Sequence, residues 1–188
     1  MILKEIIEKP TFSFDDLFEK DVKLHSFEID CSLLKFPQYE HYFDAYGENQ
    51  MFNLIESLKE IDKPCLYWFE AENEEKASNL ILALNDFRLN NPKNRTIPAK
   101  NRNINSKCIY VGIRQAGKRK DGFTNIAGRM VIHFGYYKVP STQGLQLVYW
   151  AKEKIKLTVM ELPSESSIFL NVLEKELAKK LKPLCGRH

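Results

Sequence analysis

The chain has 188 residues, with 28 Lys and Arg against 25 Asp and Glu, so its formal net charge is only +3. The two signs are unevenly distributed. Residues 1–75 carry 18 acidic and 7 basic side chains, whereas residues 76–188 carry 7 acidic and 21 basic ones. The stretch from Arg88 to Lys120 holds ten basic residues and no Asp or Glu. A one-sided segment of this kind favours a polyanionic partner, most often nucleic acid, over a small-molecule substrate.

The composition predicts a globular protein with no membrane segment. Hydrophobic residues make up 44% of the chain and aromatic ones 12%, which is too much for a disordered protein. No apolar run approaches the roughly 20 residues of a membrane span, and no secretory signal is visible at the N-terminus. The four cysteines lack the paired spacing of a metal finger and stand at Cys31, Cys65, Cys108 and Cys185. We therefore expect a cytoplasmic protein.

The predicted elements fall into two regions. Residues 1–63 form an N-terminal extension expected to pack on the core, with a helix starting near Ser13, a half-buried strand at 22–29 and helical spacing at 52–58. The elements predicted in residues 64–188 are strands at 65–69, 108–113, 145–150 and 155–162, and helices at 74–88, about 125–134 and about 164–182. This order predicts an α/β fold of the α+β kind, a small central antiparallel β-sheet flanked by helices.

Short motifs along residues 64–188 resemble those of the GIY-YIG nuclease family. Cys65-Leu66-Tyr67 stands where the family has Gly-Ile-Tyr, and Tyr110-Val111-Gly112 stands where it has Tyr-Ile-Gly. Arg129 on the following helix and Glu174 ahead of a closing Lys-Pro pair complete the ordered set.

Three features depart from the family pattern. Cys65 replaces the first glycine, and Gly186 stands where many members have an asparagine. The 43 residues from Tyr67 to Tyr110 far exceed the usual short hairpin, and resemble the insertions of restriction-enzyme-like members. The departures leave a second interpretation open, a catalytically inactive GIY-YIG-like module that binds DNA or another protein.

The resemblance implies a metal-dependent endonuclease that hydrolyses DNA phosphodiester bonds, with one Mg²⁺ or Mn²⁺ held by Glu174. It also implies that Tyr67 acts as general base and that Tyr110 positions the attacking water. The planar guanidinium of Arg129 could grip the scissile phosphate. His133 follows Arg129 by four residues on the same predicted helix face, as in similar restriction-type members. Cutting both strands of a duplex is easiest with two copies, which favours a homodimer.

The residue pattern supports Glu174 independently of the resemblance. This carboxylate interrupts the apolar stripe formed by Leu170, Leu173, Leu177 and Leu181. A carboxylate in such a stripe is costly unless it is paired or binds a cation. The alternative to a metal ligand is therefore a structural ion pair.

The other candidates also have structural alternatives. Arg129 could face solvent, and His133 could orient a tyrosine, deprotonate it, or lie on the surface. A tyrosine with a pKa near ~10 is a poor base unless a cation or His lowers that pKa. Tyr67 and Tyr110 could instead simply pack within the sheet.

The basic stretch supplies candidate contacts to double-stranded DNA. Several phosphate contacts would make affinity strongly salt-dependent. The candidates are Arg88, Lys93, Arg95, Lys100, Arg102, Lys107, Arg114, Lys118, Arg119 and Lys120. A merely soluble loop is the alternative, although such loops usually carry mixed charge. The acidic residues before position 75 could dock a basic partner or cover the chain's own basic face.

Overall fold

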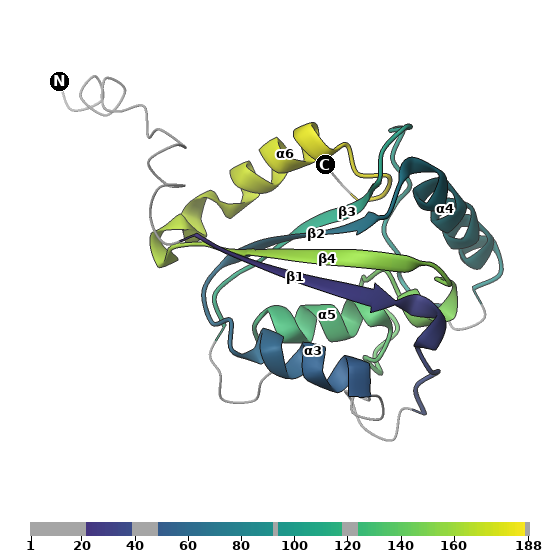
Figure 1. Cartoon of the computed structure of the whole chain (residues 1–188), viewed down its shortest axis with the longest axis horizontal. Coiled ribbons are helices and arrows are strands. Elements are labelled where there is room, and N and C mark those ends of the chain that lie inside the picture. The colour runs from purple at the N-terminus through teal and green to yellow at the C-terminus, as the bar shows by residue number, and fades with distance from the viewer. Residues whose placement is uncertain (1–21, 39–48, 92–93, 118–123, 187–188) are drawn as a thin grey trace.

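The computed structural model describes residues 22–38, 49–91, 94–117 and 124–186 (Figure 1). Its centre is a four-stranded sheet in which every neighbouring pair is antiparallel. In spatial order the strands are β1 (Lys23–Asp30), β4 (Lys154–Glu161), β2 (Cys65–Ala71) and β3 (Cys108–Arg114).

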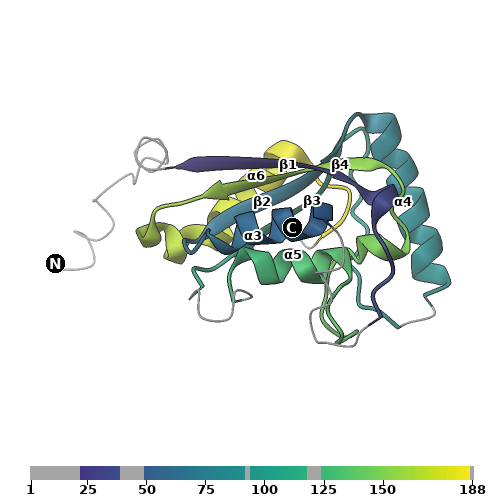
Figure 2. The ribbon, with the colours of Figure 1, turned by 60° about the horizontal axis from the view of Figure 1, so that its bottom comes forward.

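Helices cover both faces of this sheet. Figures 1 and 2 show α3 (Asn49–Lys59) and α5 (Ile126–Phe134) on one face and α6 (Leu170–Leu181) on the other. Helix α4 (Glu74–Leu89) lies at one end of the sheet (Figure 1). The predicted fold class, a small central antiparallel sheet flanked by helices, is confirmed.

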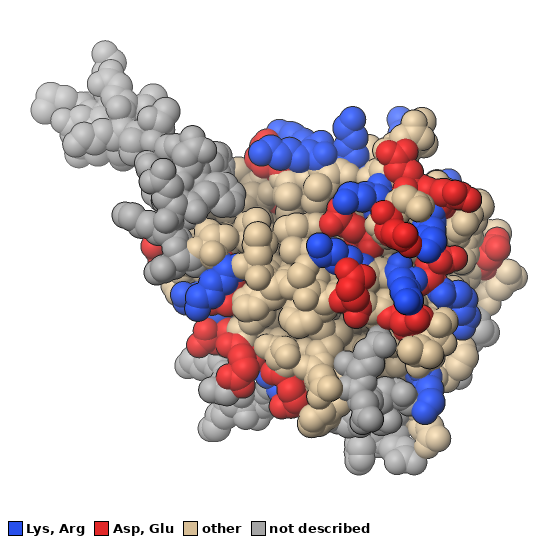
Figure 3. Space-filling model, in the orientation of Figure 1, with Lys and Arg blue, Asp and Glu red and all other residues tan. Residues whose placement is uncertain are grey.

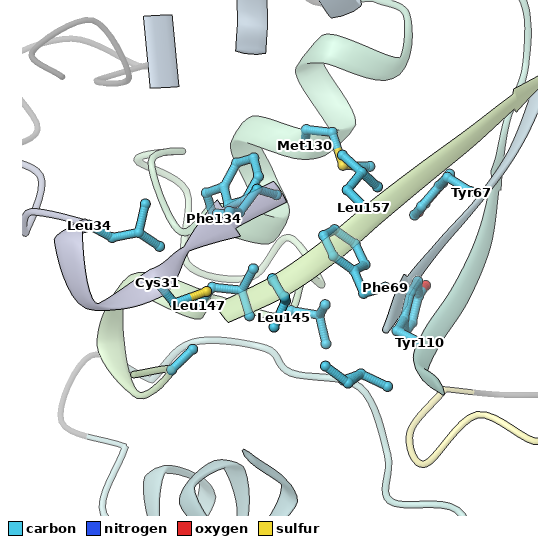
Figure 4. Close-up of a cluster of buried hydrophobic side chains, with 14 of the residues drawn as sticks. Cys31, Leu34, Tyr67, Phe69, Tyr110, Met130, Phe134, Leu145, Leu147 and Leu157 are labelled. Atoms are coloured by element: carbon cyan, nitrogen blue, oxygen red, sulfur yellow. The ribbon is translucent and has the colours of Figure 1, made fainter. Parts of the chain in front are cut away.

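The sequence of β2 explains why this strand lies inside the sheet. Residues 65–69 form a nearly continuous apolar run, which suits a strand covered on both faces. Because side chains alternate along a strand, Tyr67 and Phe69 join the main core cluster on the α5 face (Figure 4). Leu66 points the other way and packs with Leu173 of α6. Tyr67 therefore lies on the face of the sheet opposite to α6.

Asn125 fixes both the start of α5 and its position beside α3. Its Oδ1 accepts a hydrogen bond from the amide of Ala127 at 3.0 Å. Its Nδ2 donates to the carbonyls of Leu58 and Ile61, at 3.2 and 2.8 Å, where α3 ends. Gly135 ends α5 at φ +95°, a left-handed conformation that suits glycine. Both boundaries of this helix agree with the prediction.

Residues 22–38 and 49–63 contribute to the same core as the other described residues. β1 pairs with β4 along its whole length, and helix α3 places Met51 and Leu58 in one buried cluster with Phe134 of α5. The extension therefore supplies an edge strand and a helix to the central unit. The helix expected near Ser13 lies outside the described residues.

One predicted strand is wrong. Residues 145–150 form no strand, and Leu147–Tyr149 is a single 3₁₀ turn. Gln146 adopts φ +61°, which breaks the extended geometry. The indole of Trp150 donates back to the carbonyl of Leu145 at 2.7 Å. A short buried apolar run of this kind looks like a strand because its apolar residues show no helical period.

Two further sequence expectations can be compared with the fold. Among the helices in the described ranges, none is long and apolar enough to cross a membrane. All four cysteines are buried with free thiols.

Candidate active site

The Tyr67 hydroxyl is the point at which the predicted site residues meet. Its Oη lies 3.0 Å from Nε of Arg129 and 2.9 Å from Nε2 of His133. Both partners project from α5, where they are one turn apart. Tyr110 of β3 stacks beside Tyr67 with ring centroids 6.2 Å apart, and its hydroxyl lies 3.5 Å from Nη2 of Arg129. The fold thus brings four of the five predicted residues into one cluster.

The hydrogen bonds of His133 determine which ring nitrogen carries the proton. The amide of Leu145 donates to Nδ1 of His133 at 3.1 Å, so Nδ1 has no proton of its own. The neutral ring then carries its proton on Nε2, and that N–H donates to the Tyr67 hydroxyl. His133 therefore orients Tyr67 and cannot accept its proton in this state. Its side chain is fully buried, so the surface alternative is wrong.

Burial keeps both of these groups neutral near pH 7. It raises the pKa of Tyr67 well above the ordinary value, although the Arg129 cation opposes the shift. It lowers the pKa of His133 well below its ordinary value, and the Arg129 charge lowers it further. Tyr67 therefore rests as a phenol that accepts two hydrogen bonds, one from a cation and one from a neutral imidazole.

Arg129 is partly committed to holding the cluster together. Its Nε donates to Tyr67, and its Nη1 donates to the carbonyl of Gln143 at 2.7 Å. The contact with Tyr110 is long, at 3.5 Å. A guanidinium has five N–H groups, so two are not used by these three contacts. Arg129 is half-buried and keeps donors that a phosphate could accept from.

Two main-chain groups of the segment after α5 complete the cluster, and the sequence did not indicate them. They are the carbonyl of Gln143, which binds Arg129, and the amide of Leu145, which binds His133. Main-chain groups have no residue signature, and the apolar run at 145–150 predicts a strand at Leu145. Only the tertiary structure shows that this segment turns back onto α5.

Gly112 explains why a glycine follows the second tyrosine motif. It lies directly opposite Tyr67 in the β2–β3 register. A Cβ on Gly112 would lie 2.5 Å from Cζ of Tyr67, closer still to its Oη, and 2.9 Å from Cε1 of Tyr110. The Tyr67 hydroxyl therefore occupies the space that a side chain at position 112 would fill.

Glu174 stands apart from the cluster. It projects from α6, on the other side of the sheet, and is half-buried. Burial raises the pKa of this carboxyl, while the Arg129 and Lys175 cations oppose the shift. Within the described ranges Glu174 makes no hydrogen bond and no ion pair, so the structural ion pair has no partner there. The Arg129 cation, which projects from α5, nevertheless lowers the pKa of Glu174.

The residues around Glu174 determine how a metal ion could be held. In the part of the chain that the structure describes, no three His, Cys, Asp or Glu side chains gather as a metal site. A half-buried carboxylate with no competing partner suits a hard cation such as Mg²⁺ or Mn²⁺. The remaining ligands would have to be waters and substrate oxygens, so such an ion would bind together with the substrate.

Two of the predicted DNA contacts have structural roles. Arg95 is only 5% exposed, donates to the carbonyl of Tyr137 at 2.7 Å and lies over the Tyr149 ring. This burial leaves Arg95 little surface with which to contact DNA. Arg88 binds the side chain of Asn85 at 2.7 Å and a main-chain carbonyl at 2.6 Å.

The other predicted contacts differ in exposure. Lys100 and Arg102 are exposed. Lys107 is exposed and pairs with Glu70 at 3.3 Å, and Arg114 binds the carbonyl of Thr124. Four candidates lie outside the described residues, namely Lys93, Lys118, Arg119 and Lys120.

Comparison with known proteins adds nothing to this geometry. Protein-family models, curated proteins and solved structures all yield no match to the chain. The function therefore has to be argued from the site.

Proposed function

We propose that the chain is a GIY-YIG-like, metal-dependent endonuclease that hydrolyses phosphodiester bonds in double-stranded DNA. The observation that carries the proposal is the pair of donors on the Tyr67 hydroxyl, Nε of Arg129 and Nε2 of His133. A tyrosine that only packs in a sheet does not need a buried cation and a buried imidazole on one oxygen.

The two donors stabilise the phenolate form of Tyr67 and so oppose the effect of burial, which keeps the group a phenol near pH 7. A phenol oxygen that already accepts two hydrogen bonds has no lone pair left for a further proton. Base chemistry at this oxygen therefore requires the phenolate, which both donors stabilise and which burial opposes. The fraction of phenolate rises with pH, so a reaction that uses Tyr67 as base becomes faster as pH rises.

Arg129 and Glu174 have complementary roles in this proposal. The unused N–H groups of Arg129 bind the scissile phosphate, and Tyr110 keeps the guanidinium in place. Glu174 would hold the divalent ion, which supplies charge neutralisation at the phosphate and a more acidic bound water. The proposal assigns this activity to the cytoplasm, where free thiols persist, and to a homodimer that cuts both strands.

The direct test compares two glutamates of the same helix. Supercoiled plasmid is incubated with wild type, Glu174→Gln or Glu176→Gln, with Mg²⁺ and with Mg²⁺ plus a chelator. Glu176 is exposed and pairs with Lys179, so its loss should not affect cleavage. We expect Glu174→Gln to lower the rate of plasmid nicking about 100-fold or more, since each ~1.36 kcal/mol of lost transition-state stabilisation by the metal lowers the rate tenfold. Equal nicking by both variants would refute the assignment of Glu174.

The burial of Tyr67 favours a second candidate function. The side chain is 1% exposed and holds its proton at neutral pH, as a tyrosine would in a module that binds DNA without cutting it. This alternative predicts salt-sensitive DNA binding with no nicking under Mg²⁺ or Mn²⁺ at any protein excess.

A further inference from the structure

A basic groove lies between α6 and the loop that precedes β3. One wall carries Lys175, Lys179 and Lys182, and the other carries Lys100 and Arg102. The groove has a volume of about 670 Å³, and no carboxylate of the described residues lines it. Figure 3 shows basic side chains gathered over α6, whereas both signs mix over the α4 side.

The loop wall of the groove is held by the chain end that follows α6. Nδ2 of Asn101 and Nδ2 of Asn103 both donate to the carbonyl of Pro183, at 2.9 and 2.8 Å. One N–H of each asparagine amide therefore holds the loop against the segment that follows α6. Lys100 and Arg102 alternate with them and remain exposed.

Most of the cations in the groove have no ion-pair partner among the described residues. Lys179 pairs with Glu176 at 2.5 Å. The other four cations of the groove form no ion pair with any residue that the structure describes. Like charges brought together in a concave surface raise the local potential and attract an anion.

Lys182 occupies a backbone position that does not suit a lysine. It caps α6 in the left-handed conformation, with φ +50° and ψ +58°. Glycine or asparagine adopts this conformation at lower cost, and either is the usual residue there. Fold stability alone would favour glycine at 182, so the lysine points to a role for its charge.

We propose that this groove binds the phosphate backbone of a DNA strand. Lys175 and Lys179 of α6 and the capping Lys182 span seven residue steps, about 10 Å of helix, which matches the axial rise of about three nucleotides of one B-DNA strand. Its charged groups are amines and a guanidinium, which bind phosphates of any sequence. A groove with two walls can enclose a nucleic-acid strand, whereas a flat membrane surface could not contact both walls. The inference rests on the proposed function for the choice of DNA, but it requires no cleavage.

The groove also lies next to the candidate site. Lys175 directly follows Glu174 on α6, and both side chains share an electrostatic interaction. A strand in the groove would therefore pass the carboxylate that the proposed function assigns to the metal. Helix α6 would contribute both the backbone contacts and the metal ligand.

The test compares two variants that lower the net charge by the same three units. The groove variant carries Lys100→Ala, Arg102→Ala and Lys182→Gly, and the control variant carries Lys152→Ala, Lys156→Ala and Lys180→Ala. The three control lysines are exposed and lie outside the groove, and Lys180 is on the same helix. Affinity for a fluorescent 20-base-pair duplex is measured in chelator across a salt series.

We expect the slope of log affinity against log salt to fall by about 2.7 in the groove variant, since each lost phosphate contact removes about 0.9. The control should keep the wild-type slope. Equal slopes in both variants, or no duplex binding by wild type at low salt, would overturn the inference. So would displacement of the duplex by polyglutamate at equal charge concentration, because that assigns the groove to any polyanion.

Two outcomes separate this inference from the proposed function. A wild type that binds through the groove but does not nick plasmid with Mg²⁺ supports the groove and rejects the nuclease. A wild type that nicks plasmid while the groove variant binds as tightly as the control supports the nuclease and rejects the groove. Lys182→Gly alone should fold with an unchanged or higher denaturation midpoint, so weaker binding by it cannot be ascribed to unfolding.

Discussion

Replacing Tyr67 by Phe should destabilise the fold, although the ring that fills the core is retained. The change removes the acceptor for two donors. The N–H of His133 is fully buried and loses its partner outright, which costs about 1–3 kcal/mol. Arg129 is only half-buried, so water can replace part of its lost bond, at about 0.5–1.5 kcal/mol. We expect the free energy of unfolding to fall by roughly 2–4 kcal/mol.

A double-mutant cycle isolates the contribution of His133. Urea denaturation is measured for wild type, Tyr67→Phe, His133→Leu and the double variant. In the double variant no imidazole N–H is left unpaired, so the two losses should overlap by roughly 1–2 kcal/mol. His25→Leu is the matched control, since His25 bonds to Glu161 and shares no partner with Tyr67.

Additivity would refute the assigned hydrogen bond. If the Tyr67 and His133 losses add to within about 0.5 kcal/mol, as expected for the His25 control, the two side chains are not coupled. A Tyr67→Phe variant as stable as wild type would also contradict the geometry, because it would mean that the buried N–H of His133 has another acceptor.

The remaining predictions concern stability. Gly112→Ala should lower the free energy of unfolding by about 1–3 kcal/mol, because the new Cβ overlaps the Tyr67 ring; urea midpoints check this, and wild-type stability would contradict it. His133 has a lowered pKa, so below pH ~6.5 the unfolded chain binds a proton that the folded chain does not. Stability should therefore fall by up to about 1.4 kcal/mol per pH unit on acidification from that point, with no change above it. The His133→Leu variant should lack this part of the loss in parallel urea titrations at pH 7 and 5.5.

Local sequence patterns predict most of the helices and strands correctly, because few segments show both a helical and a strand pattern. The strand alternation at 22–29 and the apolar run at 65–69 had no helical period to compete with, and both became strands of one sheet. Asn125 and Gly135 bracket α5 as a cap and a stop, so that helix could be placed within a residue. The strand prediction for residues 145–150 was wrong because a buried turn and a buried strand contain the same kinds of apolar residue.

The candidate site was less accessible to sequence reasoning. Spacing along α5 placed Arg129 and His133 on one face, and the structure brings both to Tyr67. Sequence spacing could not place Glu174 relative to this cluster. The face of the sheet that α6 covers depends on how the chain connects β4 to α6, which residue spacing does not reveal. Nor could charge counting show that Arg95 is buried, because burial of a basic residue depends on partners far along the chain.

The fold shows which of the basic residues counted along the sequence form one exposed surface. Ten basic residues lie from position 88 to position 120. Among those that the structure describes, Lys100 and Arg102 are exposed and bind no described carboxylate or carbonyl group. These two face the α6 lysines, which lie outside the basic stretch and which charge counting along the chain could not connect with it. Glu174 directly precedes Lys175 and senses the charge of Arg129. In the two proposals helix α6 carries Lys175 and Lys179 of the groove as well as Glu174, so variants on this one helix would separate backbone binding from cleavage.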